Sequence, residues 1–206
     1  VLFRLLLESV DGRVHLSQVI PVFKAGKPVF IDKPLAAELT DALAIDMAAK
    51  QYNAKWFSSS SLRFSPGILK YRSGDSVRPV GVTAWGPCSL DPTHSDLFWY
   101  GIHGVEILYT AMGTGCQQVT RVGTKGTDVA VGVWDDGRIG TFRGLRDGKK
   151  DYGLLVFGEQ AIELGGKYEG YGPLVQQIAE FFVDGTVPVS NQETIEMMVF
   201  MQAADR

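Results

Sequence analysis

The sequence predicts an α/β plus α+β fold, in which a parallel sheet comes first and a mostly antiparallel sheet packed with helices follows. In the first third, strand-like and helix-like runs alternate at short spacing, which is typical of parallel βαβ units. Beyond about residue 65, β-branched and aromatic runs are separated by tight glycine turns, as in an antiparallel meander. We therefore expect one domain over residues 1–65 and a second over residues 66–206.

The first domain is expected to begin with a strand and a helix. Residues 1–10 (VLFRLLLESV) form a mostly apolar run that ends at a turn formed by Asp11 and Gly12. Gly26 stands where a glycine commonly follows the end of a helix. The apolar residues between these points recur at helical spacing and are Leu16, Val19, Ile20 and Phe23.

A second strand and helix follow in the same pattern. Residues 28–32 (PVFID) predict a short buried strand, and Pro34 suits the first turn of a helix. Residues 54–61 (AKWFSSSS) predict the third strand. The apolar stripe expected on the intervening helix is Leu35, Leu39, Ala42, Leu43 and Met47.

The second domain is expected to contain one long helix before its meander. Residues 78–86 predict a strand, and residues 96–113 predict a helix that is capped by Ser95 or Asp96 and ends at Gly113. The expected meander strands lie within residues 116–123, 127–144 and 152–158, with a hairpin turn at Asp136 and Gly137. Two closing helices are expected, the second starting at a capping box of Ser190 and Glu193.

Composition excludes several function classes. The formal net charge is -3, so no basic field attracts nucleic acid or an anionic membrane. No apolar run is long enough to span a bilayer. Cys88 and Cys116 lie far apart in sequence, which indicates neither a disulfide framework nor a zinc site. We expect two reduced thiols, no metal and a cytoplasmic protein.

Asp32, Lys33 and Pro34 stand at the carboxyl end of the predicted second strand. Open α/β sheets place ligand sites at this edge. A lysine that is partly desolvated there has a lowered pKa and can act as an acid or a base, and a carboxylate can bind sugar hydroxyls. The alternative interpretation is a solvated turn followed by a helix-opening proline.

His103 lies in the glycine-flanked segment YGIHGVE of the predicted long helix. Trp99, Glu106 and Thr110 have the spacing that places them on the same helical face. One interpretation is an acid/base histidine that Glu106 orients. The other is a half-buried histidine in an amphipathic helix.

His15 and Arg63 are weaker candidates. His15 follows the first strand and its turn, where it either caps the helix or contacts a ligand. Arg63 follows the third strand, where it either clamps an anionic or hydroxylated substrate or forms a surface salt bridge. The 24 glycines include no G-x-G-x-x-G loop after an N-terminal strand, and the sequence has no Walker motif and no nucleophile elbow.

Three segments together resemble the Gfo/Idh/MocA family of NAD(P)-dependent oxidoreductases, which includes glucose-fructose oxidoreductase and inositol dehydrogenase. Residues 15–36 (HLSQVIPVFKAGKPVFIDKPLA) are similar to the family's histidine-containing helix, A-G-K turn and E-K-P strand end. Two further segments are similar to the family. They are RFSP at 63–66 and YGIHGVEIL at 100–108, and the second resembles the family's G-x-H-x-x-D helix. The resemblance covers nearly the whole chain.

The resemblance implies a Rossmann-type parallel sheet of which the chain holds the C-terminal half, from about the fourth strand. It therefore implies that the first part of the dinucleotide-binding domain, with its glycine loop, is missing. It also implies NAD or NADP as cofactor, and we expect this chain alone to bind either one weakly or not at all.

The resemblance further implies roles for the candidate residues. Lys33 matches the lysine that binds and polarises the substrate oxygen, and His103 matches the acid/base histidine. Trp99 stands where the family often has an aspartate. The cofactor-binding residues would be Asp32, Lys33, Pro34 and His15, and the substrate-binding residues would be Arg63, Trp99 and Glu106.

The function expected from the resemblance is the C-terminal portion of an oxidoreductase that acts on a sugar, polyol or similar hydroxylated molecule. The alternative is a non-catalytic relative that serves as a binding or assembly module. A homo-oligomer is also expected, because the sequence supplies helices for one face of the antiparallel sheet only. The candidate residues for its uncovered face are Val129, Val131, Val133, Ile139 and Phe142.

Overall fold

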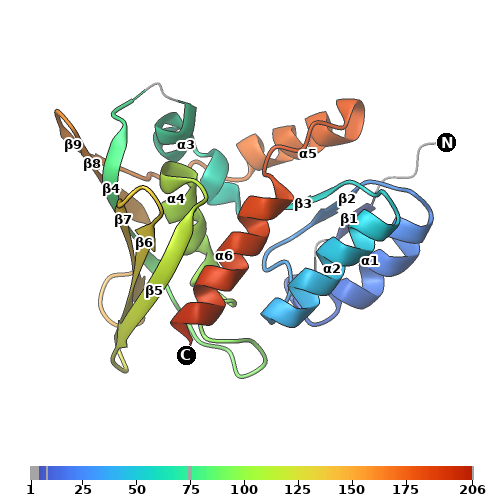
Figure 1. The fold of residues 1–206 in the computed structure, drawn as a ribbon, viewed down its shortest axis with the longest axis horizontal. Coiled ribbons are helices and arrows are strands. Elements are labelled where there is room, and N and C mark those ends of the chain that lie inside the picture. The colour runs from blue at the N-terminus through green and yellow to red at the C-terminus, as the bar shows by residue number, and fades with distance from the viewer. Residues whose placement is uncertain (1–4, 8, 74–75, 206) are drawn as a thin grey trace.

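The computed structural model describes residues 5–7, 9–73 and 76–205, which form two sheets with helices packed around and between them (Figure 1). The smaller, parallel sheet and its helices come from the N-terminal third of the chain. The larger sheet is formed by later strands, and helix α6 lies between the two parts (Figure 1). Among these described residues no helix is long and apolar enough to cross a membrane.

The smaller sheet confirms the predicted parallel α/β pattern. Its strands are β1 (Leu5–Leu7), β2 (Val29–Ile31) and β3 (Trp56–Ser58), and they pair in parallel in the order β1-β2-β3. Helix α1 (His15–Lys24) connects the first two strands and helix α2 (Leu39–Gln51) the next two. Residues 1–4 and 8 of the predicted first strand lie outside the described part of the chain.

The prediction for α2 is wrong at its start and on its buried face. The helix begins at Leu39, five residues after Pro34, and Leu43 and Met47 on the predicted stripe are 40% and 68% exposed. The backbone before the helix bonds elsewhere, because the carbonyls of Leu35 and Ala37 bind His15 and the Ser95 amide. The small residues Ala42, Ala48 and Ala49 face inward with Ile45, and their size permits the close packing of α2 against its neighbouring helices.

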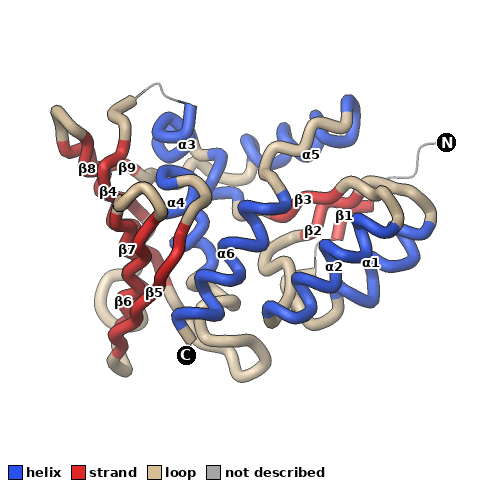
Figure 2. The backbone as a smooth tube through the Cα atoms, in the orientation of Figure 1, coloured by secondary structure: helices blue, strands red, loops and turns tan. Residues whose placement is uncertain are grey.

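The larger sheet has six strands in the order β5-β6-β7-β4-β8-β9. Strand β4 pairs with β7 in parallel and all the other pairs are antiparallel, which confirms the mostly antiparallel expectation. Figure 2 shows the strands of this sheet in red, beside the helices in blue. Gly137 has a positive φ of 85° at the predicted hairpin turn. The strands are β4 (Pro79–Pro87), β5 (Cys116–Gly123), β6 (Thr127–Trp134), β7 (Ile139–Leu145), β8 (Gly153–Gly158) and β9 (Ile162–Gly165).

Helix α4 (Ile102–Met112) is shorter than the sequence predicts. Residues 97–101 form turns, because the carbonyl of Ser95 accepts from the Phe98 amide and the carbonyl of Leu97 accepts from the Ile102 amide. These bonds span three and five residues instead of the four of an α-helix. Gly113 ends the helix as predicted, with a φ of 72°. The remaining helices are η1 (Ser61–Phe64), α3 (Pro66–Ser73), α5 (Gly172–Asp184) and α6 (Asn191–Ala204).

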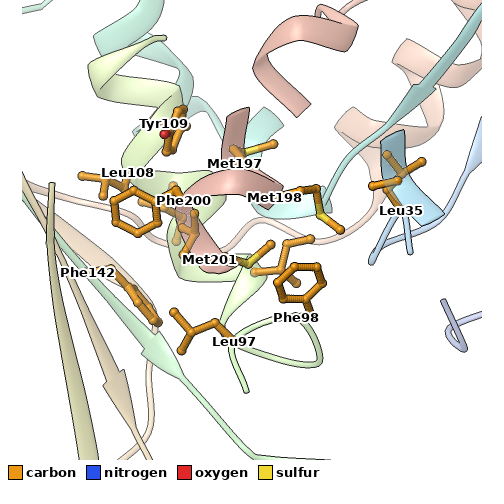
Figure 3. Close-up of a cluster of buried hydrophobic side chains, with 14 of the residues drawn as sticks. Leu35, Leu97, Phe98, Leu108, Tyr109, Phe142, Met197, Met198, Phe200 and Met201 are labelled. Atoms are coloured by element: carbon orange, nitrogen blue, oxygen red, sulfur yellow. The ribbon is translucent and has the colours of Figure 1, made fainter. Parts of the chain in front are cut away.

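One apolar core extends from the small sheet to the large one. Helix α6 contacts both α2 and α4, and it supplies Met197, Met198, Phe200 and Met201 to this core (Figure 3). The same core includes Leu35, from the loop after β2, and Phe142 of β7. The loop that carries Lys33 is therefore fixed against the helices of the larger part.

The helices cover one face of the six-stranded sheet (Figure 1). Side chains alternate along β7, so that Phe142 is fully buried against the helices while Ile139 is 52% exposed on the other face. Phe142 therefore does not belong to the uncovered face; the sequence alone left open which of the five candidate residues point there. Val129, Val131 and Val133 alternate with buried residues of β6 and lie partly exposed on that uncovered face.

Candidate active site

Lys33 lies at the carboxyl end of β2, as the sequence predicts, and two aromatic rings flank it. Its Nζ lies 5.7 Å from the centre of the Trp99 ring and 5.6 Å from that of Tyr100. Burial lowers the pKa of Lys33, and the neighbouring carboxylate of Asp32 opposes this effect. Burial raises the pKa of Asp32. The acid and the base at this strand end are therefore both partly desolvated.

His103 lies in the first turn of α4 and is partly buried. Its Nδ1 is 2.7 Å from Oγ of Ser60, and its ring packs edge-on against Tyr100 and Tyr152. Burial, together with the positive charge of Lys33, lowers the pKa of His103 to about 3. The imidazole is therefore neutral at physiological pH, and its Nε2 has no hydrogen-bond partner within the described part of the chain.

Glu106 lies one turn further along α4 and is buried. Its carboxylate does not contact His103. It accepts hydrogen bonds from the Ser59 hydroxyl, from the Ser60 amide at 2.7 Å, and from Nε of Arg63 at 2.7 Å. Glu106 therefore fixes the backbone at the end of β3, and Ser60 is the residue that links it to the imidazole.

Arg63 is buried as well, with 1% of its surface exposed, so neither a substrate clamp nor a surface salt bridge describes it. Its Nε and Nη1 donate to Glu106 and Glu193, the second at 2.6 Å. Ser190 caps α6 by accepting from the Glu193 amide, as predicted. The Glu193 carboxylate, however, binds Arg63 and Arg72 instead of returning to the cap. These charges satisfy one another inside the core.

His15 is fully buried at the start of α1. Its two ring nitrogens lie 3.1 Å from the carbonyl of Leu35 and 2.8 Å from that of Ser9. Both nitrogens thus contact protein backbone, and the ring joins the loop after β1 to the loop that carries Lys33. Pro34 is buried in this second loop. The structure places both residues as supports of the strand end.

Trp99 does not share a helical face with His103, contrary to the sequence prediction, because it precedes α4 in the turn at residues 97–101. It nevertheless lies at the site, beside Lys33 and 4.8 Å from the ring of His94. The position where the resemblance implies an aspartate is thus occupied by an aromatic ring beside Lys33. Thr110 is buried and bonds to the Glu106 carbonyl within its own helix.

Sequence reasoning missed the tyrosines around the site. Tyr100 and Tyr152 contact the ring of His103. Tyr168 accepts a hydrogen bond from Ser61, its ring packs against Tyr171, and the charge of Asp32 acts on Tyr171. Tyr152, Tyr168 and Tyr171 come from loops that are distant from His103 in sequence, so no spacing pattern indicates them, whereas Tyr100 lies three residues before His103. Sequence analysis also missed Ser60, because it lies in a run of four serines that the sequence alone does not distinguish.

The described residues contain no group of three or more His, Cys, Asp or Glu side chains that could hold a metal ion. The chemistry of this site rests on one amine, one imidazole, one carboxylate and the surrounding hydroxyls. Such a set can bind a hydroxylated molecule and move a proton to or from it.

No protein-family model matches the sequence, and no curated protein matches it. Solved structures do. GenD2 from gentamicin A biosynthesis, in complex with NAD, matches with a TM-score of 0.81 and 16% identity over 98% of this chain and 75% of that one. A putative myo-inositol dehydrogenase from Sinorhizobium meliloti 1021 matches with a TM-score of 0.79 and 14% identity over 94% and 75%.

A putative NADPH-dependent oxidoreductase from Desulfitobacterium hafniense DCB-2 matches with a TM-score of 0.79 and 14% identity, over 96% of this chain and 75% of that one. The chain therefore has the fold of Gfo/Idh/MocA-type dehydrogenases, and its antiparallel sheet with helices matches their C-terminal domain. The fold implied by the resemblance of residues 15–36, 63–66 and 100–108 is confirmed.

Proposed function

We propose that the chain belongs to an NAD(P)-dependent oxidoreductase that oxidises a hydroxyl group of a sugar, a polyol or a similar molecule. The observation that carries this proposal is the pairing of Lys33 with His103 at the carboxyl edge of the parallel sheet. The two groups are close enough for the charge of Lys33 to lower the pKa of His103. Similar solved proteins include dehydrogenases, one of them bound to NAD.

The residues at this edge fit the nicotinamide end of a dinucleotide. Asp32 offers a carboxylate for ribose hydroxyls, and the loops after β1 and β2 are held together by His15. Nicotinamide, when bound, supplies the acceptor for a hydride. The chain contains no G-x-G-x-x-G loop to bind a pyrophosphate at a helix N-terminus. We propose that these 206 residues by themselves bind NAD or NADP weakly or not at all.

Lys33, His103 and the tyrosines would bind the substrate. Lys33 and His103 would contact the reacting oxygen, one as proton carrier and one as hydrogen-bond partner. Trp99, Tyr100, Tyr152 and Tyr171 offer ring faces and hydroxyls, which suit a hydroxylated ring with apolar C–H faces. Arg63 and Glu106 act through Ser60 and would not touch the substrate.

A second candidate function is a binding or assembly module without catalysis. The aromatic Trp99 at the position where the resemblance implies an acid favours it. The experiment that separates the two functions is a panel of sugars and polyols assayed for reduction of NAD and NADP. It should use this chain at high cofactor concentration, and also the longest reading frame that contains it.

For catalysis, we expect at least one panel member to give reduced nicotinamide, and Lys33→Ala and His103→Ala to lower turnover about 100-fold. Binding of a panel member by calorimetry without any reduction would favour the binding module. Calorimetry with reduced cofactor tests the weak-binding proposal directly: a micromolar Kd for this chain would contradict it.

A further inference from the structure

The Ser60 side chain has two partners that together restrict its single proton. Ser60 is the N-cap of η1 and is buried, with 1% of its surface exposed. Its Oγ accepts a hydrogen bond from the Leu62 amide at 3.3 Å and lies 2.7 Å from Nδ1 of His103. The bond to Leu62 uses a lone pair of the oxygen, so the hydroxyl proton is free to point elsewhere.

Nδ1 of His103 is the only acceptor that the described residues offer to that proton. If Nδ1 carried a proton and donated it to Ser60, the buried hydroxyl proton would be left without a partner, which is unfavourable. The hydroxyl of Ser60 therefore donates and Nδ1 accepts. In a neutral imidazole the remaining proton is then on Nε2.

We propose that Ser60 is a positioning residue that holds His103 as the Nε2–H tautomer, so that His103 donates a hydrogen bond to the substrate oxygen and Lys33 takes the proton of the hydroxyl. This inference rests on the proposed oxidation of a hydroxyl group. It assigns the two candidate groups opposite roles from those that the resemblance implies.

The surroundings of His103 support this assignment. No carboxylate binds Nδ1, since Trp99 stands where an acid is expected and Glu106 binds Ser59, Ser60 and Arg63 instead. A proton added to Nε2 would create a cation beside Lys33. The directions of the pKa shifts agree with this assignment. The pKa of His103 is lowered to about 3, which makes its imidazole a weak base, and burial lowers the pKa of Lys33, which favours the unprotonated amine.

The proposed step balances in protons and electrons. The O–H bond of the substrate breaks and its proton moves to the neutral Nζ of Lys33. The hydrogen on the carbon that bears this oxygen would leave with the electron pair of its bond, as a hydride, to an oxidised nicotinamide, and the substrate would become a carbonyl compound. The Nε2–H of His103 donates to the oxygen throughout.

Glu106 helps to position Ser60 beside His103. Its Oε2 accepts from the Ser60 amide at 2.7 Å, so the carboxylate fixes the backbone on which the hydroxyl stands. Arg63 in turn binds Glu106 through Nε. The buried ion pair thus sets the position of Ser60, and through Ser60 it sets the proton position on His103.

The tautomer of His103 can be measured without a substrate, by nitrogen-15 NMR of protein labelled at its three histidines. His94 is an internal contrast, because its Nε2 accepts from the Gly12 amide and its proton must be on Nδ1. The variant His103→Gln assigns the signal. We expect wild-type His103 to carry its proton on Nε2 from about pH 5 to pH 8, without titrating in that range.

Three variants at the end of β3 then test the role of Ser60. Ser60→Ala should raise the Nδ1–H population of His103 at least severalfold, and Ser60→Thr, which keeps a hydroxyl, should restore the wild-type signal. Ser59→Ala removes a hydroxyl that binds Glu106 and should leave the tautomer unchanged.

A proton on Nδ1 in the wild type would overturn the proposal, even if Ser60→Ala fails to fold. An unchanged tautomer in folded Ser60→Ala would overturn it as well. Neither result depends on turnover, so each leaves the proposed oxidation to its own test.

Discussion

Arg63 and Glu106 form a buried ion pair, with 2.7 Å between Nε and Oε1 and about 2% or less of either side chain exposed. Glu193 binds the same guanidinium from α6. The pair therefore joins the end of β3 to α4, and the second contact joins it to α6. Removal of the arginine would leave the buried Glu106 carboxylate without its charged partner and Glu193 with Arg72 alone.

We expect Arg63→Met to lower the free energy of unfolding by about 3–5 kcal/mol, because it leaves uncompensated buried charge. Urea unfolding followed by circular dichroism measures this change. The matched control is Lys149→Met, which removes an ion pair with Asp151 whose side chains are largely exposed. It should change stability by about 0.5 kcal/mol or less. Equal effects of the two variants would contradict the structural role given to Arg63.

The carboxyl group of Asp205 predicts a pH dependence of stability. Burial, assisted by the charge of Asp96, raises its pKa from the ordinary value of 3.8 to about 6 in the folded protein. The folded state therefore binds more protons than the unfolded state between these values, and stability falls as the pH rises through about 6. Asp205→Asn should remove this loss of about 3 kcal/mol. Urea unfolding at a series of pH values tests it, and an equally steep fall in the variant would refute it.

The pH dependence of turnover distinguishes Lys33 from His103 as the base. An unprotonated amine is required if Lys33 takes the proton, so the rate of hydroxyl oxidation should fall about tenfold per pH unit below its lowered pKa. His103, with a pKa of about 3, would give a flat profile from about pH 5 to pH 8. The other groups that face this pair are Asp32, Tyr100 and Tyr152. His103→Gln should lower the rate and keep the slope.

The uncovered face of the six-stranded sheet predicts self-association. We propose a two-fold homo-oligomer through this face, on which Val131 and Ile139 are exposed in part. Val131→Asp should dissociate it, while Val183→Asp, a change at a valine that is 77% exposed on α5, should not. Light scattering over a dilution series gives the mass. A constant mass near 22.5 kDa for the wild type would exclude the oligomer.

The strand ends could be predicted from the sequence, because a short apolar run that stops at polar residues usually forms a buried strand that ends where the polar residues begin. Lys33 was placed correctly for this reason, since β2 must be buried and the charged pair must follow it. Gly137 and Gly113 were placed for a similar reason, because turns and helix ends with positive φ favour glycine.

The packing of charged and aromatic residues could not be predicted. Arg63 follows a strand just as a surface arginine would, and only the approach of α4 and α6 makes it a core residue. Trp99 has helical spacing to His103, but α4 begins only at Ile102, after Trp99. Tyr152 and Tyr171 interact electrostatically although both lie far from His103 in sequence. The parallel pairing of β4 with β7 is likewise not encoded in either strand alone.

We propose that Lys33 and His103 act on a hydroxyl group whose carbon loses a hydride to nicotinamide. The most direct test of this proposal uses substrates from the sugar and polyol panel that carry deuterium on the oxidisable carbons, with mass spectrometry of the nucleotide. We expect deuterium to appear in the reduced nicotinamide, and Lys33→Ala to lower the transfer about 100-fold in a folded protein. Absence of label in the nucleotide from every substrate, with the longest reading frame containing the chain and cofactor in excess, would contradict it.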